Sequence, residues 1–295
     1  MRNIDAFSSF HPLINCLYFI LIFVFTMCLM HPIMLAISLL TGIGYNLYLN
    51  RQKSRRFNLV FILPMMLLAA LLNPAFNHEG VTILMYLPNG NPLTLESITY
   101  GIAAAAMLAA VVIWFACYNA VMTSDKFVYL FGRIMPALSL ILSMTLRFVP
   151  KFLTQIKVVS EAQRCIGRDV SNGSLIQRLK NGITIISIMI TWSLENAIET
   201  ADSMKSRGYG LTGRTAFAIY RFDSRDKMAL IWLIYCTAYI AMGWLLNALY
   251  FRYFPVMKGA DFSPFSISFM VIYFALCATP ILINIYEDIK WKPSR

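Results

Sequence analysis

The chain has 295 residues, of which 59% are hydrophobic and only 13% are charged, and its mean hydropathy is +0.64. Soluble domains are about 45–50% apolar and about 25% charged, so this composition excludes an ordinary soluble domain and predicts a membrane protein. The formal net charge of +11 is compatible with a nucleic-acid partner, but the positions of the basic residues account for it without one.

Six apolar runs are candidates to cross a membrane, because a helix needs about 20 apolar residues to span the hydrocarbon layer. The first run is too long for the apolar region of a cleavable signal peptide, so we expect it to remain as a span. The proline of His31-Pro32 separates the first two runs. We predict an all-α polytopic membrane protein with about six transmembrane helices, at residues 12–30, 33–49, 58–75, 97–122, 228–250 and 266–285.

The basic residues are distributed unevenly between the loops, and short loops rich in Lys and Arg stay in the cytoplasm. The loop 50–58 carries four basic residues, whereas the segment 73–96 carries none. Residues 123–227 are rich in Lys and Arg, and the tail 290–295 carries three more. We therefore predict a multi-pass protein of the plasma membrane with both termini cytoplasmic, its basic residues beside the lipid bilayer and no nucleic acid as partner.

The chain divides into three segments on this basis. Residues 1–123 hold the first transmembrane helices and an external loop at 73–96. Residues 124–227 form a cytoplasmic region, and residues 228–295 hold the last transmembrane helices. The turn residues of LPNGNP, at 87–92, make the external loop either a short hairpin or a plain connector.

The region 124–227 is predicted to contain two long amphipathic helices. Its apolar run at 182–194 corresponds to about 20 Å of helix, which is too short to cross a membrane. If it did cross, the basic residues that follow would lie outside, against the positive-inside rule. We therefore expect a long helix that lies near the membrane surface, with its apolar face toward the spans.

The other amphipathic helix is expected over 134–169, where charged residues recur every three or four positions and form one polar stripe. Pro136 and Pro150 are expected to kink or divide it. The sequence DVSNGS at 169–174 predicts a turn, and Ser174 can cap the next helix.

Each of the two helices is predicted to end in a short segment that contains glycine. In the second segment, Ala201, Met204 and Gly208 share one helix face and leave little side-chain bulk there. Gly208 can adopt the left-handed conformation that ends a helix. Arg207 either forms a bidentate pair with a partner's carboxylate or only complements the C-terminal dipole of the helix, and the spacing leaves both open.

Two stretches resemble the transmembrane T component of energy-coupling factor (ECF) transporters, which are ABC-type importers of vitamins and metal ions. They are LRFVPKFLTQIKVVSEAQRCIGRD, at 146–169, and SLENAIETADSMKSRGYGLTGRT, at 193–215. The family carries an Ala-Arg-Gly motif at the end of each of two cytoplasmic coupling helices, and ADSMKSRGY at 201–209 fits the context of the second motif.

The resemblance implies a function in energy coupling. Each helix end docks on one of two cytoplasmic ABC-type ATPase subunits, and ATP-driven closure of these subunits tilts a small substrate-binding membrane subunit. The chain is then not an enzyme and binds no cofactor, and ATP and Mg²⁺ are bound by the partner ATPases. It contains no G-x-x-x-x-G-K-[ST] phosphate loop, in agreement with this expectation.

The same resemblance assigns the residues of the site. The first helix end is expected to dock through Ala162, Gln163, Arg164, Cys165, Ile166, Gly167 and Arg168. The second helix end is expected to dock through Ala201, Asp202, Met204, Ser206, Arg207, Gly208 and Tyr209. The apolar face of 182–194 is expected to contact the substrate-binding subunit through Ile183, Ile186 and Ile190.

The chain departs from the family pattern at both ends. In the first, the Ala-Arg-Gly positions fall on Cys165, Ile166 and Gly167, so the arginine is missing, and our hypothesis is that Arg164 or Arg168 reaches the ATPase instead. In the second, Ser206 replaces the alanine, which exchanges one small residue for another.

Three other functions agree less well with the sequence: an ordinary ABC permease, an intramembrane enzyme and a secondary transporter. EAQRCIG at 161–167 nearly fits the E-A-A-x-x-x-G loop of an ordinary ABC permease, but such a loop leaves ADSMKSRGYG unexplained. An intramembrane enzyme needs clustered carboxylates, whereas the aspartates are scattered, and neither the six cysteines nor the three histidines show metal-ligand spacing. A secondary transporter usually has ionisable residues at mid-membrane depth, and these spans have none.

Overall fold

A computed structural model of the chain describes residues 5–49, 54, 56–86, 92–209, 220–259 and 263–290. By its internal contacts the chain divides into two units. Unit 1 comprises Met1–Lys126 and Tyr220–Arg295, and unit 2 comprises Phe127–Ile219.

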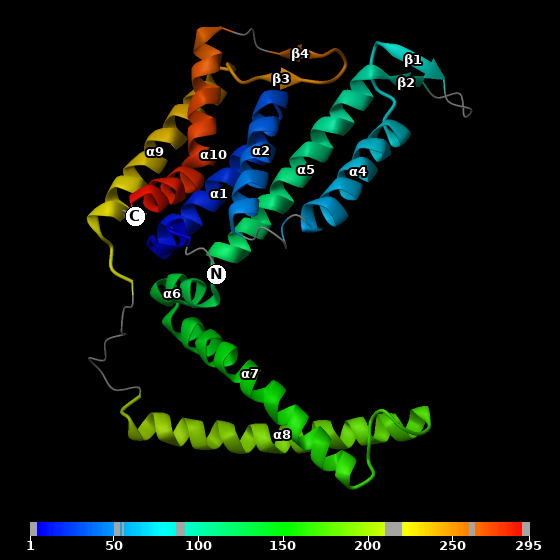
Figure 1. Ribbon diagram of the computed structural model, residues 1–295, viewed down its shortest axis with the longest axis vertical. Helices are drawn as coiled ribbons and strands as arrows, with labels where there is room; N and C mark the ends of the chain where they lie inside the picture. Colours follow the sequence, from blue (N-terminus) through cyan, green and yellow to red (C-terminus); the bar gives the residue numbers. More distant parts are fainter. Residues whose placement is uncertain are drawn as a thin grey trace. The chain divides into compact units, whose positions relative to one another are not determined.

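The six apolar runs all form helices, and these helices make up most of unit 1 (Figure 1). α2, α5, α9 and α10 are long and apolar enough to cross a membrane, whereas α1 and residues Val60–Phe76 are apolar but shorter. The chain is therefore a helical polytopic membrane protein, and the count of six spans stays a prediction. The helices are α1 (Pro12–Cys28), α2 (Pro32–Leu49), a π-helical turn (Asn58–Ile62) with α4 (Leu63–Phe76), α5 (Leu95–Val121), α9 (Ser224–Leu245) and α10 (Pro264–Lys290).

The helix starts follow from local sequence. Pro12 occupies the first turn of α1, where its missing N–H costs nothing, and His11 Nδ1 accepts a hydrogen bond from the Leu13 amide at 3.2 Å. Pro32 starts α2 after the predicted break. The Thr94 hydroxyl oxygen accepts from the Ser97 amide at 3.3 Å and caps α5.

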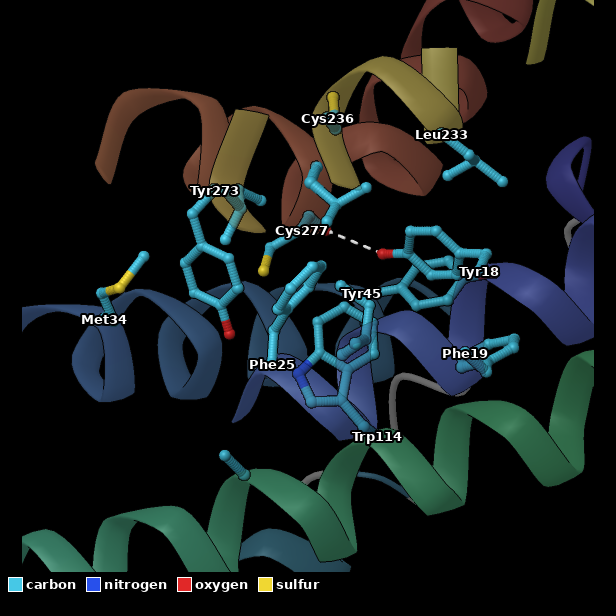
Figure 2. Close-up of a cluster of buried hydrophobic side chains, with 14 of the residues drawn as sticks. Tyr18, Phe19, Phe25, Met34, Tyr45, Trp114, Leu233, Cys236, Tyr273 and Cys277 are labelled. Atoms are coloured by element: carbon cyan, nitrogen blue, oxygen red, sulfur yellow. Dashed lines mark hydrogen bonds between the residues drawn. The ribbon is translucent and has the colours of Figure 1, made fainter. Parts of the chain in front are cut away.

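Large aromatic side chains fill the core between α1, α2, α5, α9 and α10 (Figure 2). Trp114 on α5 is fully buried, and its Nε1 donates to the Ser38 hydroxyl on α2 at 3.0 Å. The Tyr18 hydroxyl on α1 donates to the Cys277 carbonyl oxygen on α10 at 3.2 Å. These two polar groups thus each have a partner on another helix, which is what a buried tyrosine or tryptophan needs.

A buried polar cluster joins the segment that precedes α1 to α10 within unit 1. The Asn284 amide nitrogen on α10 donates to Asp5 Oδ1 at 2.6 Å, and Asn284 Oδ1 accepts from the Ala6 amide at 2.7 Å. The Tyr45 hydroxyl on α2 donates to Asp5 Oδ2 at 3.0 Å. The segment at residues 5–11, which includes a short 3-10 helix (Phe7–Ser9), therefore lies at the same end of unit 1 as the C-terminal half of α10.

Two further buried charges hold the same segment. Lys126 Nζ donates to the Ser8 carbonyl oxygen at 2.5 Å and to the Val121 carbonyl oxygen at 3.0 Å, and burial lowers the pKa of Lys126. The His11 amide donates to Asp226 Oδ1 at 3.1 Å. The chain therefore leaves unit 1 after α5 and returns to it before α9 at the end where residues 5–11 lie.

Two short antiparallel strand pairs lie at the opposite end of unit 1 (Figure 1). β1 (Ile83–Tyr86) pairs with β2 (Pro92–Thr94), so the loop that the sequence predicts to be external contains a pair of strands and is not a plain connector. β3 (Phe251–Arg252) pairs with β4 (Lys258–Gly259). The expected all-α class thus holds for the spans but not for these loops, and most of the LPNGNP turn lies outside the described residues.

Unit 2 consists mainly of two long helices, α7 (Pro136–Cys165) and α8 (Leu175–Ser206), which follow α6 (Ser124–Ile134). The chain divides at Pro136, as predicted, but α7 continues through Pro150. The Ser174 hydroxyl accepts from the Gln177 amide at 3.4 Å, which confirms the predicted cap of α8. α8 is not among the helices that are long and apolar enough to cross a membrane.

Candidate functional site

The C-terminal end of α7 is closed by a glycine in the left-handed conformation. The Gly167 amide donates to the Arg164 carbonyl oxygen at 3.0 Å, and the Arg168 amide donates to the Gln163 carbonyl oxygen at 2.9 Å. Gly167 has φ = +79°, and nothing lies within 4 Å of the position that a Cβ would occupy. This pair of bonds is a Schellman motif, which satisfies the last carbonyl groups of the helix.

The C-terminal end of α8 has the same backbone structure. The Gly208 amide donates to the Lys205 carbonyl oxygen at 2.9 Å, and the Tyr209 amide donates to the Met204 carbonyl oxygen at 3.0 Å. Gly208 has φ = +75°, as predicted from its place after the last helical residues. Both predicted helix ends are therefore Schellman motifs with glycine at the same position.

The shared backbone makes the two ends comparable residue by residue. The residue before the glycine, which caps the helix, is Ile166 in α7 and Arg207 in α8. Ile166 is 68% exposed, and Arg207 is exposed as well. One end therefore presents an aliphatic side chain at the position where the other presents a cation.

The charges around the first helix end are partly paired within the chain. Arg164 Nε lies 3.7 Å from Asp169 Oδ2. Asp169 also accepts hydrogen bonds from the Ser171 hydroxyl at 2.5 Å and the Ser171 amide at 3.0 Å, and these bonds hold the pKa of Asp169 below its usual value. The Arg178 side chain donates to the Val170 carbonyl oxygen at 2.7 Å, which ties the turn to the start of α8.

The structure brings each predicted set of docking residues together at one helix end. In the first set only Gln163 is half-buried and the others are exposed. In the second set Met204 and Gly208 are half-buried and the others are exposed. Docking itself stays a prediction, and the part of the resembling stretch at 210–215 lies outside the described residues.

α7 and α8 cross and pack through a small apolar cluster (Figure 1). Val159 on α7 and Ile185 and Met189 on α8 are buried there. The ring of Phe152 on α7 meets the ring of Trp192 on α8 edge to face, with 5.3 Å between centroids. Aromatic pairs of this kind add to the attraction from buried area alone, so the crossing has a defined packing.

A charged residue strengthens the same crossing. Lys151 Nζ on α7 lies 5.3 Å from the centroid of the Trp192 ring and donates to Asn196 Oδ1 at 2.7 Å. Both contacts join α7 to α8, because Trp192 and Asn196 are on α8. The α7–α8 unit is therefore held by apolar, cation–π and hydrogen-bond contacts at one place.

An exposed apolar ridge runs along the face of α8 that is turned away from α7. Ile183, Ile186 and Ile190 are 66%, 60% and 55% exposed, so the three predicted contact residues lie on one accessible face. A contiguous apolar surface of this kind is typical of a protein or membrane contact. Within the predicted run the ridge also includes Leu194, and beyond the run it extends to Leu179 and Ile198.

The predicted run excludes two of these ridge residues, Leu179 and Ile198, because it stops at the flanking charges. Lys180 and Glu195 interrupt the run of apolar residues in the sequence, but on the helix they lie on other faces than the ridge. The helical period of the apolar positions continues through both charges, and this period was the signal that could have identified the longer ridge.

Comparison with known proteins identifies relatives over most of the chain. The family model CbiQ, described as cobalt transport protein, matches residues 11–217. The energy-coupling factor transporter transmembrane protein EcfT of Lactobacillus helveticus is 36% identical over 98 residues, 33% of this chain and 35% of that protein. EcfT of Lactococcus lactis is 34% identical over 101 residues, 34% of this chain and 38% of that protein.

A longer match is to an uncharacterized protein of Mycoplasma pneumoniae, which is 28% identical over 195 residues, 61% of this chain and 42% of that protein. The matches to the two EcfT proteins span only 35% and 38% of their lengths.

Proposed function

Since the chain belongs to the CbiQ family of cobalt transport proteins, whose model matches residues 11–217, we propose that it is the T subunit of an ECF-type importer. In this proposal it is a non-catalytic membrane subunit that transmits the motion of two ABC-type ATPase subunits to a small substrate-binding membrane subunit. The transported substrate is a vitamin or a metal ion. The observation that carries the proposal is the pair of matched helix ends on one α7–α8 unit.

The proposed mechanism uses the geometry of unit 2. α8 has 32 residues and is therefore about 48 Å long. The first helix end lies close in the chain to its N-terminus, and the second lies at its C-terminus, so each end docks on a separate ATPase subunit. ATP and Mg²⁺ are bound by the ATPases. Their closure moves both helix ends, and the packed crossing of α7 and α8 carries the movement to the rest of the helix pair.

The substrate-binding subunit is proposed to lie against the apolar ridge of α8. Ile183, Ile186 and Ile190 supply aliphatic surface without side-chain hydrogen-bonding groups. The ridge and the substrate-binding subunit can therefore slide past each other without breaking hydrogen bonds as the helices move. The substrate itself contacts that subunit and not this chain.

The proposed orientation places both termini in the cytoplasm. Support comes from the bond between Asp5 and Asn284, since it puts the segment at residues 5–11 and the C-terminal half of α10 on the same side of the proposed spans. The basic loop at 50–58 follows α2, whose Tyr45 bonds to Asp5 at that same end. By the positive-inside rule this end faces the cytoplasm of a plasma-membrane protein.

The docking proposal is tested by gentle detergent purification of the tagged full chain, with partners identified by mass spectrometry. The wild type should retain two ATPase polypeptides or two copies of one, together with a small membrane protein. Arg207→Glu should lose docking at the second helix end with unchanged membrane insertion. Lys157→Glu, the same charge change at an exposed site on α7 outside both predicted sets of docking residues, should have no effect.

The result also separates the alternatives. Loss of membrane expression with Arg207→Glu, or full ATPase recovery with it, would contradict the docking role. A second permease and a soluble binding protein among the partners would favour the ordinary ABC importer with an E-A-A-type loop. Absence of any ATPase from the wild-type sample would refute the proposed function.

Contact with the substrate-binding subunit is tested by crosslinking from single cysteines. Ile186→Cys and Ile190→Cys, on the ridge, should capture a small membrane protein. Glu195→Cys, which is exposed on another face of α8, is the matched control and should not. Equal capture from ridge and control positions would show that the ridge has no specific partner.

A further inference from the structure

The two helix ends of unit 2 share one backbone but differ in the chemistry of their side chains. Each is a Schellman motif with the same two hydrogen bonds and with glycine at the left-handed position. The direction of the side chain that precedes the glycine is set by this backbone. A difference between Ile166 and Arg207 is therefore a difference at one equivalent position, and not a shift of the motif along the chain.

Neither neighbouring arginine stands at the position of Arg207 in the first helix end. Counted from the glycine, Arg164 is equivalent to Lys205 in the second helix end, and Arg168 is equivalent to Tyr209. Arg164 is also held toward Asp169 by their ion pair. An arginine that substituted for the missing one would thus have to approach the partner from a different side.

Ile166 is suited to a different kind of contact. Its side chain is 68% exposed, so it contributes little to the packing of unit 2. An exposed isoleucine at the tip of a helix gains free energy when an apolar pocket removes it from water. Arg207 requires the opposite surroundings, because a buried guanidinium needs a carboxylate.

We propose, on the basis of the proposed function, that the two helix ends are bound by chemically different pockets. The second helix end places Arg207 against a carboxylate of one ATPase subunit. The first helix end inserts Ile166 into an apolar pocket of the other. Because neither pocket suits the opposite side chain, the two ATPase subunits differ in sequence at this point, and the chain binds them in one orientation only.

The test uses equivalent positions as reporters. A photoreactive amino acid is placed at Ala162 or, in a separate variant, at Ser203, which stand at the same distance before the glycine and are both exposed. The tagged full chain is crosslinked in native membranes, and each crosslinked polypeptide is identified by mass spectrometry. Position 162 should label one ATPase polypeptide and position 203 a different one.

Substitutions at the capping position then test the chemistry. Ile166→Arg should reduce crosslinking from position 162 by about tenfold or more and leave crosslinking from position 203 unchanged. Arg207→Ile should do the reverse. Ile166→Val keeps an aliphatic side chain and should retain the wild-type pattern, which separates loss of the apolar contact from a general disturbance of the helix end.

Arg164→Ala and Arg168→Ala test the competing explanation, in which one of these arginines contacts the ATPase in place of the missing one. Both variants should keep crosslinking from position 162, and a tenfold loss in either would show that a neighbouring arginine replaces Arg207. One and the same polypeptide at both reporters, or unimpaired crosslinking in Ile166→Arg, would overturn the inference. If the wild type crosslinks no ATPase from either position, the proposed function fails together with this inference, and that result is distinct from all the others.

Discussion

Tyr45→Phe is expected to destabilise unit 1 strongly, whereas Tyr48→Phe on the same helix is not. Both hydroxyls donate to a carboxylate: Tyr45 to Asp5 at 3.0 Å and Tyr48 to Asp288 at 2.8 Å. The difference is burial, because Tyr45 is fully buried and Asp5 is nearly so, while the bond between Tyr48 and Asp288 is exposed. The pair therefore isolates the contribution of the buried polar cluster from the generic effect of losing a tyrosine hydroxyl.

The magnitude follows from the surroundings of each bond. A buried hydrogen bond to a charged acceptor contributes about 1.5–3 kcal/mol, and its removal leaves Asp5 with one donor fewer. Water replaces the donor at the exposed site, so the loss there is about 0.5 kcal/mol or less. These free energies correspond to a change of about 10- to 150-fold in the opening equilibrium of unit 1 for Tyr45→Phe and about twofold for Tyr48→Phe.

Thiol labelling measures this opening directly, because three cysteines of unit 1 are buried. The labelling rate of a buried thiol is proportional to the fraction of molecules in which it is open to solvent. The background variant has the other cysteines, at positions 16, 28 and 165, replaced by alanine, so that labelling reports only on Cys117, Cys236 and Cys277. Equal labelling rates in the two tyrosine variants would refute the assignment of the cluster as a buried stabilising element.

The other predictions concern unit 2. Gly208→Ala forces a Cβ into the left-handed region at a cost of about 1 kcal/mol and should raise amide exchange in the last turn of α8 about fivefold. Met189→Ala should destabilise the α7–α8 crossing by about 2–5 kcal/mol and lower its unfolding temperature, measured by Trp192 fluorescence. Because the Ser171 hydrogen bonds lower the pKa of Asp169, its stabilisation of the turn is complete above the ordinary pKa of aspartate and is lost as the pH falls through the lowered value. Amide exchange of the turn, followed from about pH 6 to about pH 2, should show this loss, and Asp169→Asn should abolish the pH dependence.

The features that the sequence predicts well are local. The apolar runs end at proline or at charged residues within a few positions, and the caps at Ser174 and Gly208 each depend on bonds that span three to five residues. The division of the chain at Pro136 is local as well. Such features need only the neighbouring residues and the geometry of a helix, so one sequence contains enough information to locate them.

The buried polar cluster of unit 1 could not be predicted in this way. Asp5 bonds to Asn284 across 279 positions, and Lys126 bonds to Ser8 across 118. In the sequence, Asp5 and Lys126 look like ordinary charges at the ends of spans, because nothing near them in the chain indicates burial. Their burial and their hydrogen bonds depend on how distant helices pack against one another. The spacing and periodicity of residues along the chain carry no information on that packing.

The first helix end, which lacks the arginine of the motif, is partly predictable: its residues are read from the sequence, but their positions on the helix end come from the structure. By the resemblance described above, Ile166 stands where the motif has arginine, and the sequence leaves it open whether Arg164 or Arg168 reaches the ATPase instead. Identical hydrogen bonds at the two ends argue against a shift of the motif along the chain, since a shift of one residue would take the glycine out of the left-handed position and break both bonds. Whether Arg164 or Arg168 reaches the ATPase from its own position is tested by the alanine variants. A side chain at a defined backbone position must be matched by its partner as it is. We therefore expect the departure from the motif to be matched by a change in the pocket of the proposed ATPase partner and not by a rearrangement of this chain, and the reporters at positions 162 and 203 separate these two explanations.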